Sequence, residues 1–354
     1  MKRLLPVALG LVLGLIPKVH AGNEEKGGQA GATELLINPW ARSTGWAGVY
    51  TSGAHGVEAM NLNIGGLARI QKTDLMLSNT RYLSGSGISL YSIGLAQRVG
   101  DSGALGLSLT AMNWGEIEET TVQNPDGTGS TFLPQFFNIG VSYSKIFSDR
   151  ISGGILVRVI SESISNVSAV GVAFDAGIQY QTGERNQFKF GVALRNVGPK
   201  MRYSGNGLVF RAQPGTGQNF LAAADRRSES FEMPALLNIG LSYDFELGLN
   251  HRLTAAGNFQ SNSFTSDEYQ VGVEYAFMEY FMVRGGFNYQ RGAFQGPGND
   301  FNVMMGPAAG GTLQVPFGKA DASGNKARRF GVDYSYQPTD FFSGNHAIAL
   351  RLSL

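Results

Sequence analysis

Few side chains in this sequence could carry out a chemical reaction. After the N-terminal leader the histidines are His55, His251 and His346, which are too few and too scattered for a triad or a metal site. The sequence has no G-x-S-x-G elbow, phosphate-binding loop or dinucleotide-binding fingerprint. It has no cysteine, which excludes disulfides, thiolate metal sites and a cysteine nucleophile. We therefore predict a protein that is not an enzyme and that needs no cofactor.

The stretch EIEETTVQNPDG offers carboxylates, the ligands that calcium prefers. Its acidic residues are Glu116, Glu118, Glu119 and Asp126. Their spacing matches no known arrangement of calcium ligands, so we interpret the stretch as a solvated acidic loop and predict no metal site.

The segment 198–233 is the strongest candidate for binding a partner, because a loop well over about 12–15 residues is usually functional or disordered. Two interpretations stay open. The loop forms a protein contact surface at an outer rim, or it folds down and plugs an interior. Phe341 and Phe342, in a later hairpin, are a second candidate surface. The apolar and aromatic candidates within the segment are Met201, Tyr203, Leu208, Val209, Phe210, Phe220 and Leu221.

Charged side chains occur at alternate positions of otherwise apolar segments. In the segment 328–338, for example, Phe330, Val332 and Tyr334 share one face and Asp333 lies on the other. An Arg or Lys facing lipid near the midplane costs about 2–4 kcal/mol, so charges of both signs on one face indicate an interior where they pair. The predicted interior residues are Asp175, Lys189, Arg195, Asp244, Glu274, Arg284, Asp333 and Arg351.

Strands must position these residues. Alternation with a period of two runs from about residue 72 to the end, and Gly makes up 49 of the 354 residues, which suits strands and tight turns. About 14 strands are predicted, each near the length that crosses a membrane. A soluble sandwich is the alternative. The predicted strands are 72–82, 86–99, 103–114, 133–147, 150–163, 167–182, 186–197, 234–246, 251–261, 267–277, 280–290, 303–317, 328–338 and 344–354.

Connection lengths favour the membrane barrel. Short turns alternate with the long connections 115–132, 198–233 and 291–302, as in outer-membrane barrels with short periplasmic turns and long outer loops. The connection 318–327 is an exception, since it is long and falls on the periplasmic side.

The N-terminal region predicts export to a bacterial outer membrane. Lys2 and Arg3 precede the apolar run 4–16, and Val19-His20-Ala21 offers a cleavage site, so we expect residues 1–21 to be a signal peptide. Residues 22–32 form a polar, flexible leader, and the Gly- and Ala-rich segment 33–70 forms a hatch inside or below a barrel spanning 71–354. A net charge of +1 gives no reason to expect a nucleic-acid partner. The candidate hatch residues are Trp40, Arg42, Trp46, Asn61 and Asn63.

The mature chain resembles the PorV/PorQ family in the stretches NPWARSTGWAGVYTSGAHGVEAMNLNIGGLA, FSDRISGGILVRVISESISNVSAVGVAFDAGIQYQTG, FEMPALLNIGLSYDF and FGVDYSYQPTDFFSGNHAIALRLSL. The resemblance implies a FadL-like barrel of 14 strands with an N-terminal hatch, embedded in outer-membrane lipid. It also implies a component of the type IX secretion system of Bacteroidetes-type bacteria. Such a barrel binds the C-terminal signal domain of secreted cargo, takes the cargo from a SprA-like translocon barrel and hands it to a PorU-like sortase.

Two functions from different classes therefore compete. The first is the cargo-binding barrel, and the second is a FadL-like transporter of a hydrophobic small molecule. A transporter should have a largely apolar pocket beneath the hatch, whereas the predicted interior is charged and polar, which favours the first. A purely structural role beside a large translocon is a third hypothesis.

Overall fold

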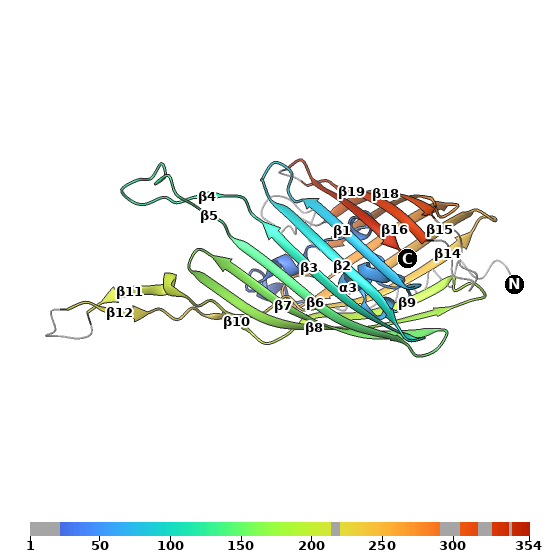
Figure 1. The fold of residues 1–354 in the computed structure, drawn as a ribbon, viewed down its shortest axis with the longest axis horizontal. Coiled ribbons are helices and arrows are strands. Elements are labelled where there is room, and N and C mark those ends of the chain that lie inside the picture. The colour runs from blue at the N-terminus through green and yellow to red at the C-terminus, as the bar shows by residue number, and fades with distance from the viewer. Residues whose placement is uncertain (1–21, 214–219, 291–304, 318–327, 340–341) are drawn as a thin grey trace.

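Fourteen strands of the described chain close into an antiparallel barrel around the N-terminal segment (Figure 1). This computed structural model describes residues 22–213, 220–290, 305–317, 328–339 and 342–354. The predicted all-β barrel is confirmed, and each predicted strand has a counterpart. In these ranges no helix is long and apolar enough to span a membrane. The wall strands, in order around the barrel, are β1 (Thr73–Arg81), β2 (Ser89–Val99), β3 (Gly103–Asn113), β6 (Gln135–Ile146), β7 (Ile151–Ile164), β8 (Val167–Thr182), β9 (Phe188–Val197), β14 (Leu236–Glu246), β15 (His251–Asn262), β16 (Glu268–Phe277), β17 (Phe281–Gln290), β18 (Gly306–Phe317), β19 (Arg328–Gln337) and β20 (Asn345–Ser353).

The two faces of the wall follow the sequence alternation. On β8, Val170, Phe174 and Ile178 point outward and are 63%, 53% and 59% exposed. Asp175 and Gln179, at positions of the opposite parity, are buried inside the barrel. The outer face is therefore the apolar one, as a wall in contact with hydrocarbon requires.

The two ends of the barrel differ. At the end we call inner, short turns join the strands, and the chain closes where the Thr73 amide donates to the Leu354 carbonyl oxygen at 3.2 Å. At the outer end, long connections extend far beyond the wall on the left of Figure 1. The connection 318–327 lies outside the described residues, as does the segment 1–21. The small elements of the long connections are β4 (Ile117–Glu118), β5 (Thr131–Phe132), β10 (Met201–Arg202), η5 (Asn206–Leu208), β11 (Val209–Ala212), β12 (Ala222–Asp225) and β13 (Ser230–Phe231).

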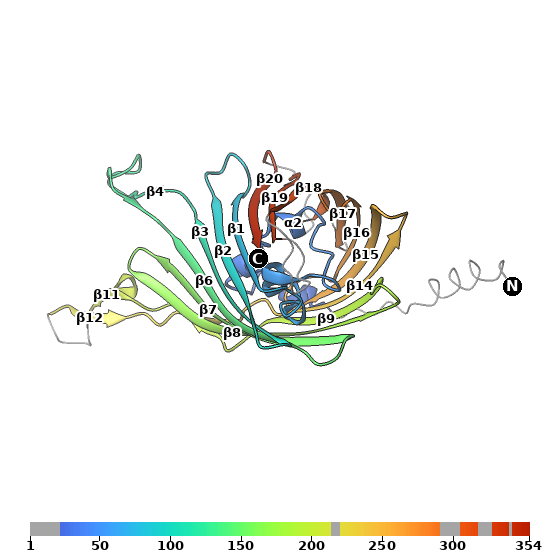
Figure 2. The same cartoon turned by 45° about the vertical axis from the view of Figure 1, so that its right-hand side comes forward.

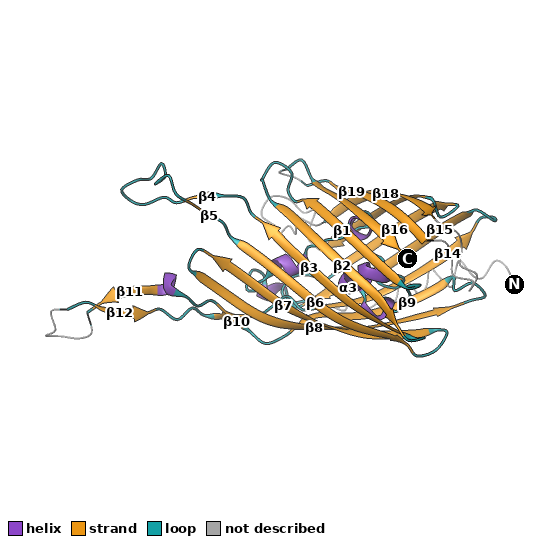
Figure 3. Ribbon diagram, in the orientation of Figure 1, coloured by secondary structure: helices purple, strands orange, loops and turns teal. Residues whose placement is uncertain are grey.

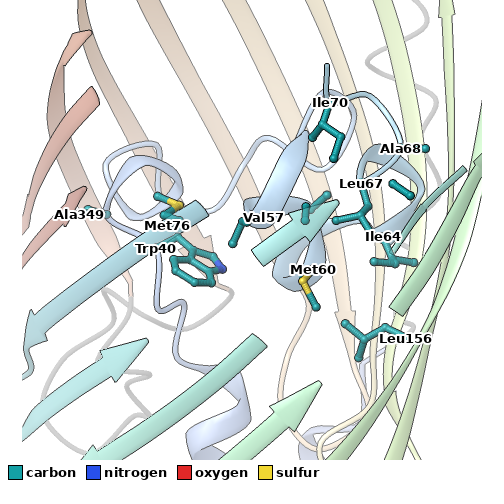
Figure 4. Close-up of a cluster of buried hydrophobic side chains, with 14 of the residues drawn as sticks. Trp40, Val57, Met60, Ile64, Leu67, Ala68, Ile70, Met76, Leu156 and Ala349 are labelled. Atoms are coloured by element: carbon teal, nitrogen blue, oxygen red, sulfur yellow. The ribbon is translucent and has the colours of Figure 1, made fainter. Parts of the chain in front are cut away.

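The segment 33–70, which we call the hatch, fills the interior (Figure 2) and supplies short helical turns there (Figure 3). An apolar cluster, including Trp40, Val57 and Met60, packs against Met76 on β1 and Leu156 on β7 (Figure 4). The helical elements of the N-terminal region are η1 (Glu24–Lys26), η2 (Thr33–Leu36), α2 (Ala41–Thr44), η3 (Gly56–Glu58), α3 (Ala59–Leu62) and η4 (Ile64–Gly66).

Wall glycines let the hatch backbone approach closely. A Cβ atom at Gly286 of β17 would lie 2.2 Å from the Trp46 carbonyl oxygen. One at Gly191 of β9 would lie 2.7 Å from the Thr51 carbonyl oxygen. Glycine is needed at both positions because any side chain would push the hatch off the wall.

The leader 22–32 lies along the outer connections. The Gly31 amide donates to the Glu232 carbonyl oxygen at 3.0 Å, and the Lys26 ammonium lies 5.5 Å from the centre of the Phe264 ring. The sequence predicts a flexible leader, whereas the structure gives these residues specific partners at the outer end.

Candidate functional site

A chain of buried ion pairs joins the hatch to the wall. The Arg42 guanidinium lies 3.4 Å from the Glu274 carboxylate on β16, and that carboxylate lies 2.9 Å from Arg284 on β17. Arg284 lies 3.7 Å from Asp333 on β19, and Arg252 on β15 lies 3.2 Å from Glu274. Removing one partner of a buried pair costs about 3–5 kcal/mol, so these contacts hold the hatch in place.

A second group of ion pairs is centred on Arg351 of β20. Its guanidinium lies 3.0 Å from Glu58 of the hatch and 3.9 Å from Asp74 of β1. Glu58 also accepts a hydrogen bond from the Ser43 amide, and Asp74 accepts one from the Val57 amide, both at 3.1 Å. The same two carboxylates therefore organise the hatch backbone and tie it to the wall.

Two further cations contact the hatch from β9. The Lys189 ammonium lies 2.6 Å from Asp244 and donates to the Tyr50 hydroxyl at 3.1 Å. Arg195 donates to the Asn61 side-chain oxygen at 3.1 Å. Both therefore fasten the hatch from one strand.

Asp175 lies at an irregularity between β8 and β9. It binds Arg158 through two hydrogen bonds of 2.9 and 2.7 Å, and Arg158 also donates to the Met60 carbonyl oxygen at 2.6 Å. The other Asp175 oxygen accepts the Asn196 amide at 2.7 Å. One buried carboxylate therefore completes the wall and holds the arginine that reaches the hatch.

Asn63 anchors the middle of the hatch by donating to the carbonyl oxygens of Thr51 and of Ile178 on β8, at 3.1 and 3.0 Å. The Trp46 ring stacks on Tyr50 with centroids 4.9 Å apart. All five predicted hatch residues are buried, namely Trp40, Arg42, Trp46, Asn61 and Asn63.

The eight predicted interior residues all lie on the inner face of the wall. They do not form one cluster. Asp175 and Arg195 lie on the neighbouring strands β8 and β9. The others belong to the ion-pair groups around Glu274, Arg351 and Lys189. The eight residues are Asp175, Lys189, Arg195, Asp244, Glu274, Arg284, Asp333 and Arg351.

A cavity of about 410 Å³ lies on the inner side of the hatch. It is lined by Tyr50, His55 and charged side chains, among which the basic ones outnumber the acidic. Burial, together with the nearby arginines, lowers the pKa of His55 to about 3, so this hatch histidine is neutral. The charged groups of the cavity wall include Arg69, Lys189, Arg252, Arg329, Arg351, Asp74, Asp244 and Glu279.

The outer side of the hatch is different, because one half of the interior there is apolar. Leu35 of the hatch packs with residues at the outer ends of β2, β3, β6, β7 and β8 and with two methionines of the long connection. Aromatic side chains, including Tyr82, Trp114 and Phe231, pack around them. The wall residues and methionines are Leu90, Met112, Phe136, Ile160, Ala169, Ala173, Met201 and Met233.

The long connection 198–233 divides into two parts. Its base lies over the interior, where Met201 is 1% exposed and Tyr203 packs on Phe231 with ring centroids 5.4 Å apart. Its far part forms the β11–β12 hairpin, which stands clear of the barrel (Figure 1). The base of the connection therefore covers the interior, and the β11–β12 hairpin projects from the outer end. The exposed apolar residues of the far part are Val209, Phe210, Phe220 and Leu221, and Leu208 is half-buried.

The remaining candidates from the sequence do not form a site in the described part of the chain. Phe342 is 44% exposed, and Phe341 lies outside the described residues. His346 contacts the Tyr334 hydroxyl at 2.9 Å, away from the interior. Within the described ranges no group of three His, Asp or Glu residues could hold a metal ion, and the acidic stretch 116–127 is exposed.

Sequence reasoning missed Glu34, Glu58, Arg158 and Glu162. Arg158 and Glu162 share the inward parity of β7, so the alternation could have identified them. Glu34 and Glu58 are isolated acidic residues in a segment of small and apolar residues, and this isolation is the sequence feature that could have identified them as candidates.

No protein-family model and no curated protein matches the sequence. Solved structures do match the fold. The P. putida toluene transporter TodX gives a TM-score of 0.56 at 12% identity, covering 90% of this chain and 99% of that one. The Ralstonia pickettii toluene transporter TbuX gives 0.55 at 13%, covering 90% and 98%. A Pseudomonas aeruginosa FadL homologue gives 0.50 at 14%, covering 88% and 96%.

The chain has the fold of FadL-like outer-membrane barrels. At these identities the likeness concerns the fold alone. It agrees with the FadL-like barrel that the resemblance to the PorV/PorQ family implies, and it extends no further toward a secretion system.

Proposed function

We propose that this barrel transports a hydrophobic small molecule across the outer membrane, with the hatch as its gate. The observation that carries the proposal is the arrangement of the interior. The apolar cluster around Leu35 at the outer end and a cavity of about 410 Å³ at the inner end lie on opposite sides of the hatch, which ion pairs fasten to the wall.

The names of the similar structures support this choice. TodX and TbuX are toluene transporters, and a further similar structure, CymD, is a monoaromatic hydrocarbon channel. Their substrates are not assigned to this chain, but they indicate that barrels of this fold can pass apolar molecules.

The polar inner cavity does not oppose the proposal. A transporter needs its apolar surface where the molecule is captured, and here the apolar cluster lies at the outer end, beneath the base of the connection 198–233. A charged cavity at the inner end binds an apolar molecule poorly and therefore favours its release.

The experiment is to lock the hatch. The Ser52 hydroxyl of the hatch lies 2.8 Å from the Ser242 hydroxyl of β14, and the chain has no native cysteine. In the double variant S52C/S242C a disulfide would join hatch and wall. We expect uptake of a hydrophobic probe by cells with an intact outer membrane to stop under oxidation and return on reduction. The single variant S52C is the control. Unchanged uptake with the disulfide formed would refute the gate.

A second candidate is the cargo-binding barrel of a type IX secretion system. The projecting β11–β12 hairpin favours it, because Phe220 and Leu221 are 57% and 62% exposed on an arm that stands clear of the barrel. The proposed partners are secreted proteins with a C-terminal signal domain, a SprA-like translocon barrel and a PorU-like sortase.

Two measurements separate the candidates. Pull-down of the tagged protein from solubilised outer membranes should recover those partners if the second candidate is correct, and deleting residues 208–221 should abolish their recovery. Cargo binding should also survive the hatch lock, whereas transport should not. Partner recovery that persists after the deletion would rule out the hairpin as the contact surface.

A further inference from the structure

Two carboxylates lie beside the apolar cluster around Leu35 at the outer end of the barrel. Glu34 belongs to η2 of the hatch, and Glu162 lies near the outer end of β7 and is 7% exposed. Burial raises the pKa of Glu34, and the charge of Glu162 adds to the rise. Burial also raises the pKa of Tyr82, with a contribution from Glu34. Leu35, which follows Glu34, packs with Phe136 and Tyr82 in one cluster, and Phe136 is the strand partner of Glu162, so both carboxylates lie beside the same apolar side chains.

The Tyr203 hydroxyl satisfies only one oxygen of Glu162. It donates to Oε2, and the pKa of Tyr203 is raised by burial and by this bond. Oε1 of Glu162 is buried and has no hydrogen-bond partner among the described residues. A buried carboxylate oxygen without a donor costs several kcal/mol, so this site lacks one donor.

No cation of the described residues forms an ion pair with either carboxylate. Arg158, four residues before Glu162 on the same strand, is bound to Asp175 and to the Met60 carbonyl oxygen. Lys200, in the nearby connection, pairs with Glu232 at 3.1 Å. The two acidic groups therefore lie beside apolar side chains without a neutralising partner from the described part of the chain.

The side chains beside the carboxylates are aromatic and apolar. Phe136 is paired with Glu162 across β6 and β7 and is 2% exposed. Tyr82, Trp114 and Phe231 pack around the same cluster. Aromatic faces next to anionic oxygens favour a positive charge carried on an apolar molecule.

We propose that Glu34 and Glu162 bind the primary ammonium group of an apolar amine at the outer mouth. The ammonium donates to the unpartnered Glu162 Oε1 and neutralises the pair, and the apolar part of the molecule lies against the aromatic side chains. This inference rests on the proposed transport function and narrows its substrate to hydrophobic amines.

The test compares two probes of the same shape. In detergent or nanodiscs at pH 7.5, 2-phenylethylamine should bind the full mature chain at least about tenfold more tightly than the neutral 2-phenylethanol. In the variant E162Q the amine should lose at least about tenfold in affinity while the alcohol is unchanged. E34Q, at a half-exposed position, should cause a smaller loss and serves as the second variant. Glu229 is an exposed acid of the same long connection, so E229Q is the matched control and should change neither.

Equal binding of amine and alcohol, or equal effects of E162Q and E229Q, would overturn the inference. Hatch-dependent uptake of the alcohol without preference for the amine would overturn it and leave the transport function standing. Amine binding that depends on Glu162 without hatch-dependent uptake would support the site and refute transport.

Discussion

Replacing Glu58 with glutamine should release the hatch while leaving the barrel folded. The Arg351 side chain is 6% exposed and lies 3.0 Å from Glu58 but 3.9 Å from Asp74, so the substitution removes its nearer partner. Glutamine can still accept the Ser43 amide, which limits the loss to the ion pair. Breaking one partner of a buried pair costs about 3–5 kcal/mol. Because Arg351 keeps its contact with Asp74, we expect a loss of about 3 kcal/mol, at the lower end of this range. Such a loss raises the fraction of molecules with a displaced hatch roughly 100-fold.

The assay is thiol labelling of S242C, since Ser242 is 2% exposed beneath the hatch. When opening and closing are fast, the labelling rate follows the open population, so E58Q should accelerate it about 100-fold. The control is E246Q, because Glu246 pairs with Arg185 in an exposed ion pair at the inner rim, and such pairs contribute close to nothing. An unchanged labelling rate, or acceleration only together with unfolding of the barrel, would refute the assignment of this pair to the hatch.

Three further predictions use the same structure. Burial lowers the pKa of His55 from 6.5 to about 3, so the contribution of neutral His55 to hatch docking is present above pH 6.5 and is lost as the pH falls toward 3, by at most about 1.4 kcal/mol per pH unit. The rate of S242C labelling, normalised to that of an exposed cysteine, should therefore rise as the pH is lowered from 7.5 to 5.5. H55Q should flatten this pH profile. In Gly66→Ala the new Cβ would lie 1.8 Å from the Ala54 carbonyl oxygen. Overpacking of this kind costs about 1–3 kcal/mol, so the S242C labelling rate should rise at least about fivefold. A rate equal to that of the parent would contradict this packing. Asp175→Asn leaves Arg158 buried without its carboxylate, and the denaturation midpoint of the purified barrel should drop, reflecting about 3–5 kcal/mol; an unaltered midpoint would show that the wall does not depend on this pair.

The wall was predictable because its signal is local. Successive side chains of a strand point to opposite faces, so apolar runs such as Val170, Phe174 and Ile178 identify the outward face without knowledge of any partner strand. The same parity places Asp175 and Glu274 inside. The hatch was recognisable from composition, since small residues without a period of two cannot form a lipid-facing wall.

The partners of the interior charges were not predictable. Arg42 and Glu274 are 232 residues apart in the sequence, and several arginines of suitable parity could have met that carboxylate. The leader is a similar case. GNEEKGGQAGA has the composition of a flexible segment, and only the presence of Glu232 and Phe264 at the outer mouth gives it partners.

The sequence by itself determined an all-β chain, its strands, the side of the wall on which each residue lies, and the segment that fills the interior. These properties depend on alternation and composition, which are read along the chain. Only the tertiary structure decided that the base of the connection 198–233 covers the interior while its hairpin projects, that ion pairs fasten the hatch, and that Tyr203 meets Glu162. The physical reason is that closing a barrel brings distant residues to the same depth and side of one interior, and which charges then pair there depends on distances that no local pattern encodes.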